Sequence, residues 1–188
     1  MSRRVSMINK GVIRELNETI VVLDVETTGF SKYKDRIVEL GAIKLEKGRK
    51  IGELNLLINP CMIIPDKVIS VHGITNEMVS DKPNERFYLP EILKFLNGVS
   101  YIVAHNANFD IGFIEEMFKR NGYSFDCDYI DTLEASKSLI HGTSSYKLVD
   151  LASFLHIDVK TSHRALADVE TTVMLLRHLA YRVMQLNL

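Results

Sequence analysis

The chain has 188 residues, 46% of them hydrophobic and 25% charged, which is typical of one globular domain with a buried core and argues against two independent domains. Its 23 basic and 24 acidic residues give a formal charge of −1, which excludes a polycation that binds nucleic acid through charge alone. The longest apolar runs are too short to span a membrane, and two isolated cysteines predict neither a disulfide framework nor a zinc site. We therefore expect a soluble, cytoplasmic protein without a membrane partner, whose ligand is held by a local site.

The predicted elements follow one another first as antiparallel strands and then as strand-helix units. Residues 1–18 are polar and predict an N-terminal tail, so the folded domain is expected to span residues 19–188. The hydrophobic periods predict strands at residues 20–25, 36–45, 51–58, 101–104 and 129–132, and helices at residues 87–96, 109–120, 146–155 and 164–185. A hairpin turn is predicted at residues 46–49. This order predicts an α/β domain in which a mixed sheet has helices packed on its faces.

Two acidic residues lie at the end of the first predicted strand. Asp24 and Glu26 are two positions apart, so both side chains project from one face of the strand while Val25 points to the other. The alternative is a strand that emerges into solvent, where alternating charges are ordinary. The pair alone leaves both interpretations open, because a signal of two residues is weak.

A third carboxylate lies at the junction between the strand at 101–104 and the helix that follows. Asp110 shares a helical face with Phe113, Ile114 and Met117, which places it in register with the buried stripe. The alternative is that an acid in a first helical turn is stabilised by the helix dipole, by about 0.3–1 kcal/mol. Because an unpaired buried charge costs several kcal/mol, an inward-facing Asp110 requires a cation, hydrogen-bond donors or a metal ion.

A fourth carboxylate and a histidine lie at the start of the last predicted helix. Asp168 is in register with Thr172, Leu175 and Leu179 beside the apolar stripe, so we expect it to be half-buried against the sheet. His163 precedes it by a rotation of about 140°, so the two side chains cannot share one face of an unbroken helix. We expect His163 at or before the first turn, where it can point into a cleft; a surface or capping histidine is the alternative.

Four acids and a histidine on three separate elements favour one common site. Oxygen ligands select hard cations such as Mg²⁺ or Mn²⁺ over zinc. Two such ions about 3.5–4 Å apart suit an in-line displacement at phosphorus, in which one ion activates water and the other stabilises the departing oxygen. The expected substrate is therefore a phosphodiester.

Three motifs together resemble a known family. DVETTG at residues 24–29, NANFD at residues 106–110, and His163 followed by Asp168 are similar to the motifs of the DEDDh, or DnaQ-like, 3′–5′ exonucleases. This family includes the proofreading epsilon subunit of bacterial DNA polymerase III, and the resemblance extends from about residue 20 to residue 179. It implies a ribonuclease H-like fold and the release of nucleoside 5′-monophosphates from the 3′ ends of DNA.

The resemblance also implies a role for each motif residue. Asp24 would bridge two divalent ions, Glu26 and Asp168 would complete the first ion's ligands, and Asp110 would hold the second ion. His163 would take the proton from the attacking water, since an imidazole exchanges protons near neutral pH. By the same resemblance, the substrate would meet residues Thr27, Gly29, Phe30, His72, Asn106 and Phe109.

Several alternatives remain open at this stage. Phe109 fits a core position as well as it fits a base-stacking position. Single-stranded or frayed DNA 3′ ends are the expected substrate, but RNA 3′ ends are an alternative because the same five residues serve both sugars. A non-catalytic module that binds strand ends, or a zinc hydrolase, is less favoured. Because the chain ends directly after the last predicted helix, a free-standing nuclease, a DNA polymerase subunit and one domain of a larger polymerase all remain possible.

Overall fold

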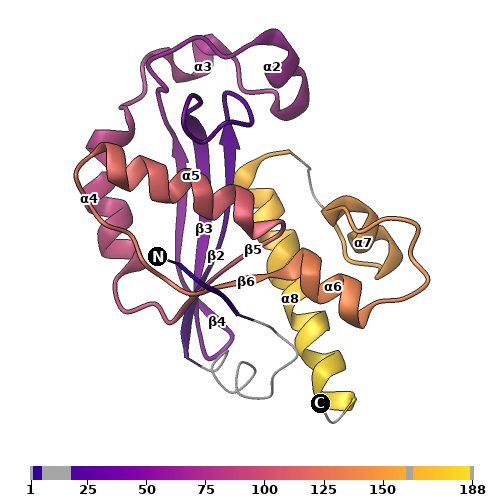
Figure 1. Ribbon diagram of the computed structural model, residues 1–188. Helices are drawn as coiled ribbons and strands as arrows, with labels where there is room; N and C mark the ends of the chain where they lie inside the picture. The colour runs from indigo at the N-terminus through magenta and orange to yellow at the C-terminus, as the bar shows by residue number, and fades with distance from the viewer. Residues whose placement is uncertain (1, 6–17, 160–162, 187–188) are drawn as a thin grey trace.

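The computed structural model describes residues 2–5, 18–159 and 163–186, which form a six-stranded mixed sheet with helices on both faces (Figure 1). The strands are β1 (Arg4–Val5), β2 (Thr19–Thr27), β3 (Ile37–Glu46), β4 (Arg49–Leu57), β5 (Tyr101–Ala104) and β6 (Tyr129–Asp131). Their order in the sheet is β1-β6-β5-β2-β3-β4. β2, β3 and β4 pair antiparallel, whereas β5, β6 and β1 run parallel to β2. The predicted antiparallel meander followed by parallel strands is therefore present.

The helices cover the two faces of this sheet. They are α2 (Asp66–His72), α3 (Asn76–Ser80), α4 (Glu85–Leu96), α5 (Ala107–Arg120), α6 (Thr132–Leu139), α7 (Leu148–Phe154) and α8 (Ala165–Gln185). Figure 1 shows α5 lying across the face of the sheet that is turned toward the viewer. α4 and α5 pack on this face, and α6, α7 and α8 pack on the other.

The alternation of side chains along β2 divides the core into two layers. Leu23 and Val25 belong to the cluster under α4 and α5. Ile20 and Val22 belong to the cluster that α6, α7 and α8 cover. Because every second side chain of a strand points the same way, Asp24 follows Ile20 and Val22 onto the α8 face. The strand thus changes from apolar to acidic on the face where α8 packs.

The strands and helices predicted from residue 20 to residue 185 are present, each with ends within two residues of those predicted. The hairpin turn between β3 and β4 is also confirmed, since Lys47 and Gly48 have φ angles of 50° and 74° in the left-handed region that such turns require. Both cysteines are free, as expected. Within the described residues, none of the helices is both long enough and apolar enough to cross a membrane.

The sequence patterns do not predict three short helices, α2, α3 and α6. α6 follows β6 without a connecting loop, so there is no turn signal between the two elements. Asp131, the last residue of β6, accepts a hydrogen bond from the Leu133 backbone N–H at 3.0 Å and caps the helix. A period of 3.6 cannot be recognised in segments of five to eight residues that also serve as connections.

The start of the chain also differs from the predicted N-terminal tail. Arg4–Val5 forms the edge strand β1, which pairs with β6, and Arg3 forms an ion pair with Asp128 at 2.7 Å. A two-residue strand is held through its backbone and leaves no alternation to detect in the sequence. Residues 6–17, the greater part of the predicted tail, lie outside the described residues.

Candidate active site

Two acids project from β2 toward α8. Asp24 is paired across the sheet with Gly41 of β3, and Glu26 with Glu39. Both Asp24 and Glu26 are half-buried, so they are neither solvated strand ends nor core residues. The predicted arrangement of two carboxylates on one face of the strand is therefore present.

The third acid reaches this pair from α8. Asp168 lies in the first turn of the helix and is half-buried, as its position in the helical period predicts. One carboxylate oxygen each from Asp24, Glu26 and Asp168 lie within 4.8 Å of one another. We call these three residues the carboxylate cage. Three oxygen ligands at this spacing fit a hard divalent cation, which offsets the mutual repulsion of the acids.

The fourth acid lies beside the carboxylate cage and is not one of its three members. Asp110, near the start of α5, is only 2% exposed, and its Oδ1 atom accepts a hydrogen bond from the Val25 backbone N–H at 3.1 Å. Val25 stands between Asp24 and Glu26, so this bond fixes α5 to the acidic end of β2. The structure therefore brings all four predicted acids to the same end of β2.

The pKa values of these acids show how unfavourable their joint ionisation is. Burial first, and then repulsion from Asp110 and Glu26, raise the pKa of Asp24 well above its ordinary value. Burial followed by repulsion from Asp168 raises the pKa of Glu26 to about 7. Burial likewise raises the pKa of Asp110 and that of Asp168. A bound cation stabilises the ionised form of all four groups, so their electrostatics also fit a metal centre.

An ion pair fixes the start of α8 to the sheet. Glu39 is 1% exposed, and both its carboxylate oxygens accept hydrogen bonds from the Arg164 guanidinium, at 2.6–3.1 Å. Glu39 Oε2 also accepts a bond from the Ala165 backbone N–H at 2.9 Å. A bidentate pair fixes direction as well as distance. Because Glu39 is paired with Glu26 across the sheet, the helix that carries Asp168 is attached directly beside the carboxylate cage.

A glycine permits the close approach of the same helix. A Cβ atom on Gly41 would lie 2.5 Å from the carbonyl carbon of Ala165 and from the backbone nitrogen of Leu166. Sequence reasoning missed both Gly41 and Glu39. The available signal was an acid and a glycine within the apolar strand predicted at residues 36–45, where a side chain facing the core needs a partner.

His163 lies two residues before α8, as predicted. Its φ angle of 60° turns the backbone so that its N–H donates to Asp168 Oδ2 at 3.1 Å. The residue is exposed and, with Asp168, lines a cavity beside the carboxylate cage. The histidine is thus attached through its backbone to one member of the cage.

The end of β2 and the end of α2 meet at Thr27. His72 is buried, and its Nδ1 accepts a hydrogen bond from the Ile74 backbone N–H at 3.0 Å. Its Nε2 therefore carries the proton and lies 3.3 Å from the Thr27 carbonyl oxygen. Burial is the main cause that lowers the pKa of His72, which keeps this imidazole neutral. The structure brings together Thr27 and His72, two of the predicted substrate contacts.

The loop between β2 and β3 presents an aromatic residue to solvent. Phe30 is 89% exposed, and its ring lies edge-on to that of Phe109 with 6.5 Å between ring centroids. Phe109 is half-buried, packs on the core and lies 4.9 Å from Phe113 between ring centroids, so its predicted core position is present while base stacking stays a prediction. Next to Phe30, a Cβ atom on Gly29 would lie 2.6 Å from an Asp35 carboxylate oxygen, so the loop is closely packed at this point.

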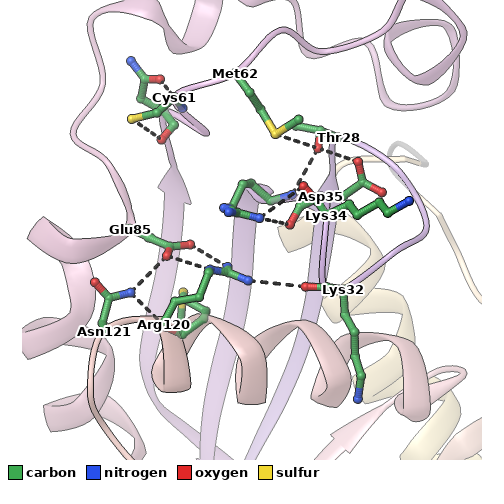
Figure 2. A network of polar contacts seen from close by, with 12 residues as sticks. Thr28, Lys32, Lys34, Asp35, Cys61, Met62, Glu85, Arg120 and Asn121 are labelled. Carbon is green, nitrogen blue, oxygen red and sulfur yellow. Dashed lines mark hydrogen bonds and ion pairs between the residues drawn. The ribbon is translucent and has the colours of Figure 1, made fainter.

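Polar contacts hold this loop in place, as Figure 2 shows. Asp35 accepts hydrogen bonds from the Thr28 hydroxyl at 3.2 Å and from the Ser31 backbone N–H at 2.8 Å. Arg120 of α5 donates to the Lys32 carbonyl oxygen at 3.3 Å and forms an ion pair with Glu85 at 2.8 Å (Figure 2). The exposed ring of Phe30 thus projects from a loop that is fixed at both ends.

The remaining predicted contact, Asn106, lies at the junction of β5 and α5. Its φ angle of 69° is left-handed, and its backbone N–H donates to Asp131 Oδ1 at 3.1 Å. Its neighbour His105, which sequence reasoning missed, is bound on both ring nitrogens, to Thr132 Oγ1 at 3.0 Å and to the Tyr146 carbonyl oxygen at 2.9 Å. A histidine directly after a buried strand was the only sequence signal for this contact.

Comparison with known proteins identifies the family. Residues 21–176 match the family model RNase_T, described as exonuclease. The chain belongs to this exonuclease family. The exonuclease family predicted from the sequence is thus confirmed.

Two relatives show how the exonuclease domain occurs in longer proteins. The chain is 37% identical over 157 residues to a DNA polymerase III PolC-type protein of Caldanaerobacter subterraneus subsp. tengcongensis, covering 84% of this chain and 11% of that protein. It is 34% identical over 171 residues to the 3′-5′ exonuclease DinG of Bacillus subtilis, covering 90% of this chain and 18% of that protein. The chain thus spans about a tenth to a fifth of the length of these relatives.

A solved structure has the same fold. Exonuclease X in complex with 5′ overhanging duplex DNA matches with a TM-score of 0.67 and 26% identity, covering 86% of this chain and 91% of that one. The predicted ribonuclease H-like α/β fold, a mixed sheet with helices on its faces, is therefore confirmed.

Proposed function

We propose that this exonuclease domain releases nucleoside 5′-monophosphates from the 3′ ends of DNA strands. The observation that carries the proposal is the carboxylate cage, in which oxygens of Asp24, Glu26 and Asp168 lie within 4.8 Å of one another in a chain of the exonuclease family. The direction is supported by the relative DinG, a 3′-5′ exonuclease, and DNA as the substrate by Exonuclease X and the PolC-type polymerase.

We assign two divalent ions, Mg²⁺ or Mn²⁺, to the four acids. Asp24 is proposed as a ligand of both ions, Glu26 and Asp168 of the first, and Asp110 of the second. The all-oxygen ligand set supports these metals over zinc. When bound, such ions supply a water of lowered pKa and stabilise the negative charge on the departing oxygen. Asp110 is buried and the other three acids are half-buried, so water screens their charges less than at an open surface, which strengthens their hold on cations.

His163 is the proposed base, as the sequence predicts. Its exposed position beside Asp168 leaves the imidazole free to accept the proton of the attacking water. The water oxygen forms a bond to phosphorus, and the bond from phosphorus to the 3′ oxygen of the preceding nucleotide breaks. That oxygen leaves with the shortened strand and takes up a proton, and the proton on His163 passes to solvent.

The terminal nucleotide is proposed to bind beside Phe30. The exposed Phe30 ring and the adjoining Phe109 ring offer aromatic surface to a base, and such stacking contributes about 1–3 kcal/mol without reading sequence. Thr27 and Gly29 lie at the base of the same loop and are proposed to contact the sugar and phosphate. His72 is buried and lies with its Nε2 against the Thr27 carbonyl oxygen, so it is proposed to position Thr27 near the nucleotide.

A proofreading role beside a DNA polymerase is supported by the PolC-type relative. The formal charge of −1 predicts weak unaided binding to DNA, which suits a domain that a polymerase supplies with strand ends. A frayed end enters a narrow site more readily than a paired one. We therefore expect faster removal of a mismatched 3′ nucleotide than of a paired one, measured on matched primer-template pairs.

The test is the release of mononucleotides from a 3′-labelled single strand with Mg²⁺ or Mn²⁺. Asp24→Ala should abolish the release, whereas Glu91→Ala, which removes an exposed acid of α4, should not change it. Parallel RNA strands test the alternative substrate, and a rate on RNA above that on DNA would replace DNA by RNA in the proposal. Full activity in Asp24→Ala, or saturable end binding without turnover in any divalent metal, would refute the proposed function.

A further inference from the structure

A cavity of about 640 Å³ adjoins the carboxylate cage. Part of its wall comes from His163 and Asp168 at the start of α8 and from Asn106 at the start of α5. The remainder comes from α6, with Lys137, and from the segment that enters α7, with Lys147. We call this cavity the lysine pocket, after these two lysines. Its volume lies within the roughly 300–1,000 Å³ of sites that hold small ligands.

The lysine pocket places a free positive charge beside the acidic cage. Lys137 already forms an ion pair with Glu134 at 2.8 Å. Lys147 is exposed, and no ion pair joins it to any residue in the described part of the chain. Lys147 is therefore the lysine of this pocket that is available to an anion. While the proposed ions of the cage hold the reacting phosphate, a free cation in the adjoining pocket favours the binding of a further phosphate of the polyanionic strand.

The wall that carries Lys147 is fixed to the sheet. The residue before it, Tyr146, donates its hydroxyl to the Ile140 carbonyl oxygen at 2.9 Å, and its own carbonyl oxygen is bound to His105. Burial lowers the pKa of His105, which favours a neutral imidazole that adds no second positive charge to the pocket. Its other ring nitrogen is bound to Thr132 Oγ1. The backbone that leads into Lys147 is thus fixed to the end of β5, next to Asn106.

We propose that the lysine pocket binds the nucleotide that precedes the one being removed, with Lys147 contacting its phosphate. The inference rests on the proposed function and extends it by one nucleotide. With the terminal base beside Phe30 and the reacting phosphate at the cage, the strand must leave the site along a second wall. The lysine pocket is continuous with the cage through His163 and Asp168. Its apolar lining, Leu148 and Val149, suits the sugar and the flat face of the base of that nucleotide.

The experiment measures binding of a fluorescent ten-nucleotide DNA strand by anisotropy, with Ca²⁺ as the divalent ion, at several salt concentrations, after checking that the strand stays intact. Lys147→Ala should raise the Kd about five- to tenfold. It should also reduce the slope of log Kd against log salt concentration by about 0.7, the value for one lost phosphate contact on a single strand. Lys147→Arg should restore both quantities.

Lys94→Ala is the matched control, since it removes an exposed lysine of α4, outside the lysine pocket. An unchanged salt slope in Lys147→Ala, or an equal loss in Lys94→Ala, would overturn the inference. If the parent protein cleaves DNA and Lys147→Ala binds the strand as tightly as the parent does, the proposed role of the lysine pocket is refuted and the proposed function stands. If the parent protein binds DNA but cleaves no strand with Mg²⁺ or Mn²⁺, the proposed function is refuted instead.

Discussion

Replacing Gly41 by alanine should separate α8 from the acids of β2. Gly41 is paired with Asp24, and an added Cβ atom would lie 2.5 Å from the backbone of Ala165 and Leu166. Ordinary contact between such atoms requires about 3.5 Å, so the start of α8 must move by about 1 Å. Asp168 lies in the first turn of that helix and must move with it. A misplacement of about 1 Å in a catalytic group costs about a hundredfold in rate, which is the expected loss.

The assay compares the exonuclease rate of Gly41→Ala with that of the parent, beside thermal unfolding and titration with Mn²⁺. The control is Gly52→Ala in β4, where the added atom would meet the Phe95 ring at 3.1 Å, a side chain that can move aside. We expect Gly41→Ala to fold, to lose about a hundredfold in rate and to bind Mn²⁺ more weakly, while Gly52→Ala stays within about threefold of the parent. A folded Gly41→Ala protein with the parent's rate would refute the reasoning that close packing of α8 assembles the cage.

Three further results follow from the geometry. Glu39→Gln removes the buried carboxylate that pairs with Arg164 and should lower the free energy of unfolding by about 3 kcal/mol. This value is the low end for a broken buried pair, because Arg164 is partly exposed. An unchanged urea midpoint would contradict this prediction. Phe30→Ala should raise KM for a DNA strand about tenfold through lost stacking, and an unchanged KM would remove this residue from the site. The pKa of Glu26 rises from 4.5 to about 7, so the folded, metal-free protein holds more protons than the unfolded chain between these values. The stability of the metal-free protein should therefore fall as pH rises from about 4.5 to 7, and the contribution of Glu26 to this fall is roughly 3 kcal/mol. Bound Mn²⁺ should abolish the fall. A metal-free protein whose stability rises over this pH range would contradict the prediction.

Local periodicity predicted which face each member of the carboxylate cage occupies, and the three motifs taken together assigned these acids to one site. Asp24 and Glu26 share a face because a strand repeats every two residues, and Asp168 was placed by the 3.6-residue period of its helix. Each of these inferences needs only one element and its neighbours in the sequence. The mixed sheet and the packing of helices on its faces likewise followed from strands that precede strand-helix units, whereas the order of the strands in the sheet was not predicted.

Features that depend on two distant segments could not be predicted in the same way. Glu39 and Gly41 matter because α8, which begins at Ala165, returns to the middle of β3, and no local period encodes that return. His105 is explained by its bonds to Thr132, at the start of α6, and to Tyr146, on the segment that enters α7. The edge strand β1 is paired through its backbone, and two residues leave no pattern to detect.

The most direct test of the proposed two-ion site is a crystal structure of the protein grown with Mn²⁺, with anomalous diffraction recorded at the manganese edge. We predict two anomalous peaks about 3.5–4 Å apart, one bound by the carboxylate cage and the other within reach of Asp24 and Asp110. A map without manganese at the cage, or with Asp110 turned away from the bound ions, would contradict the account.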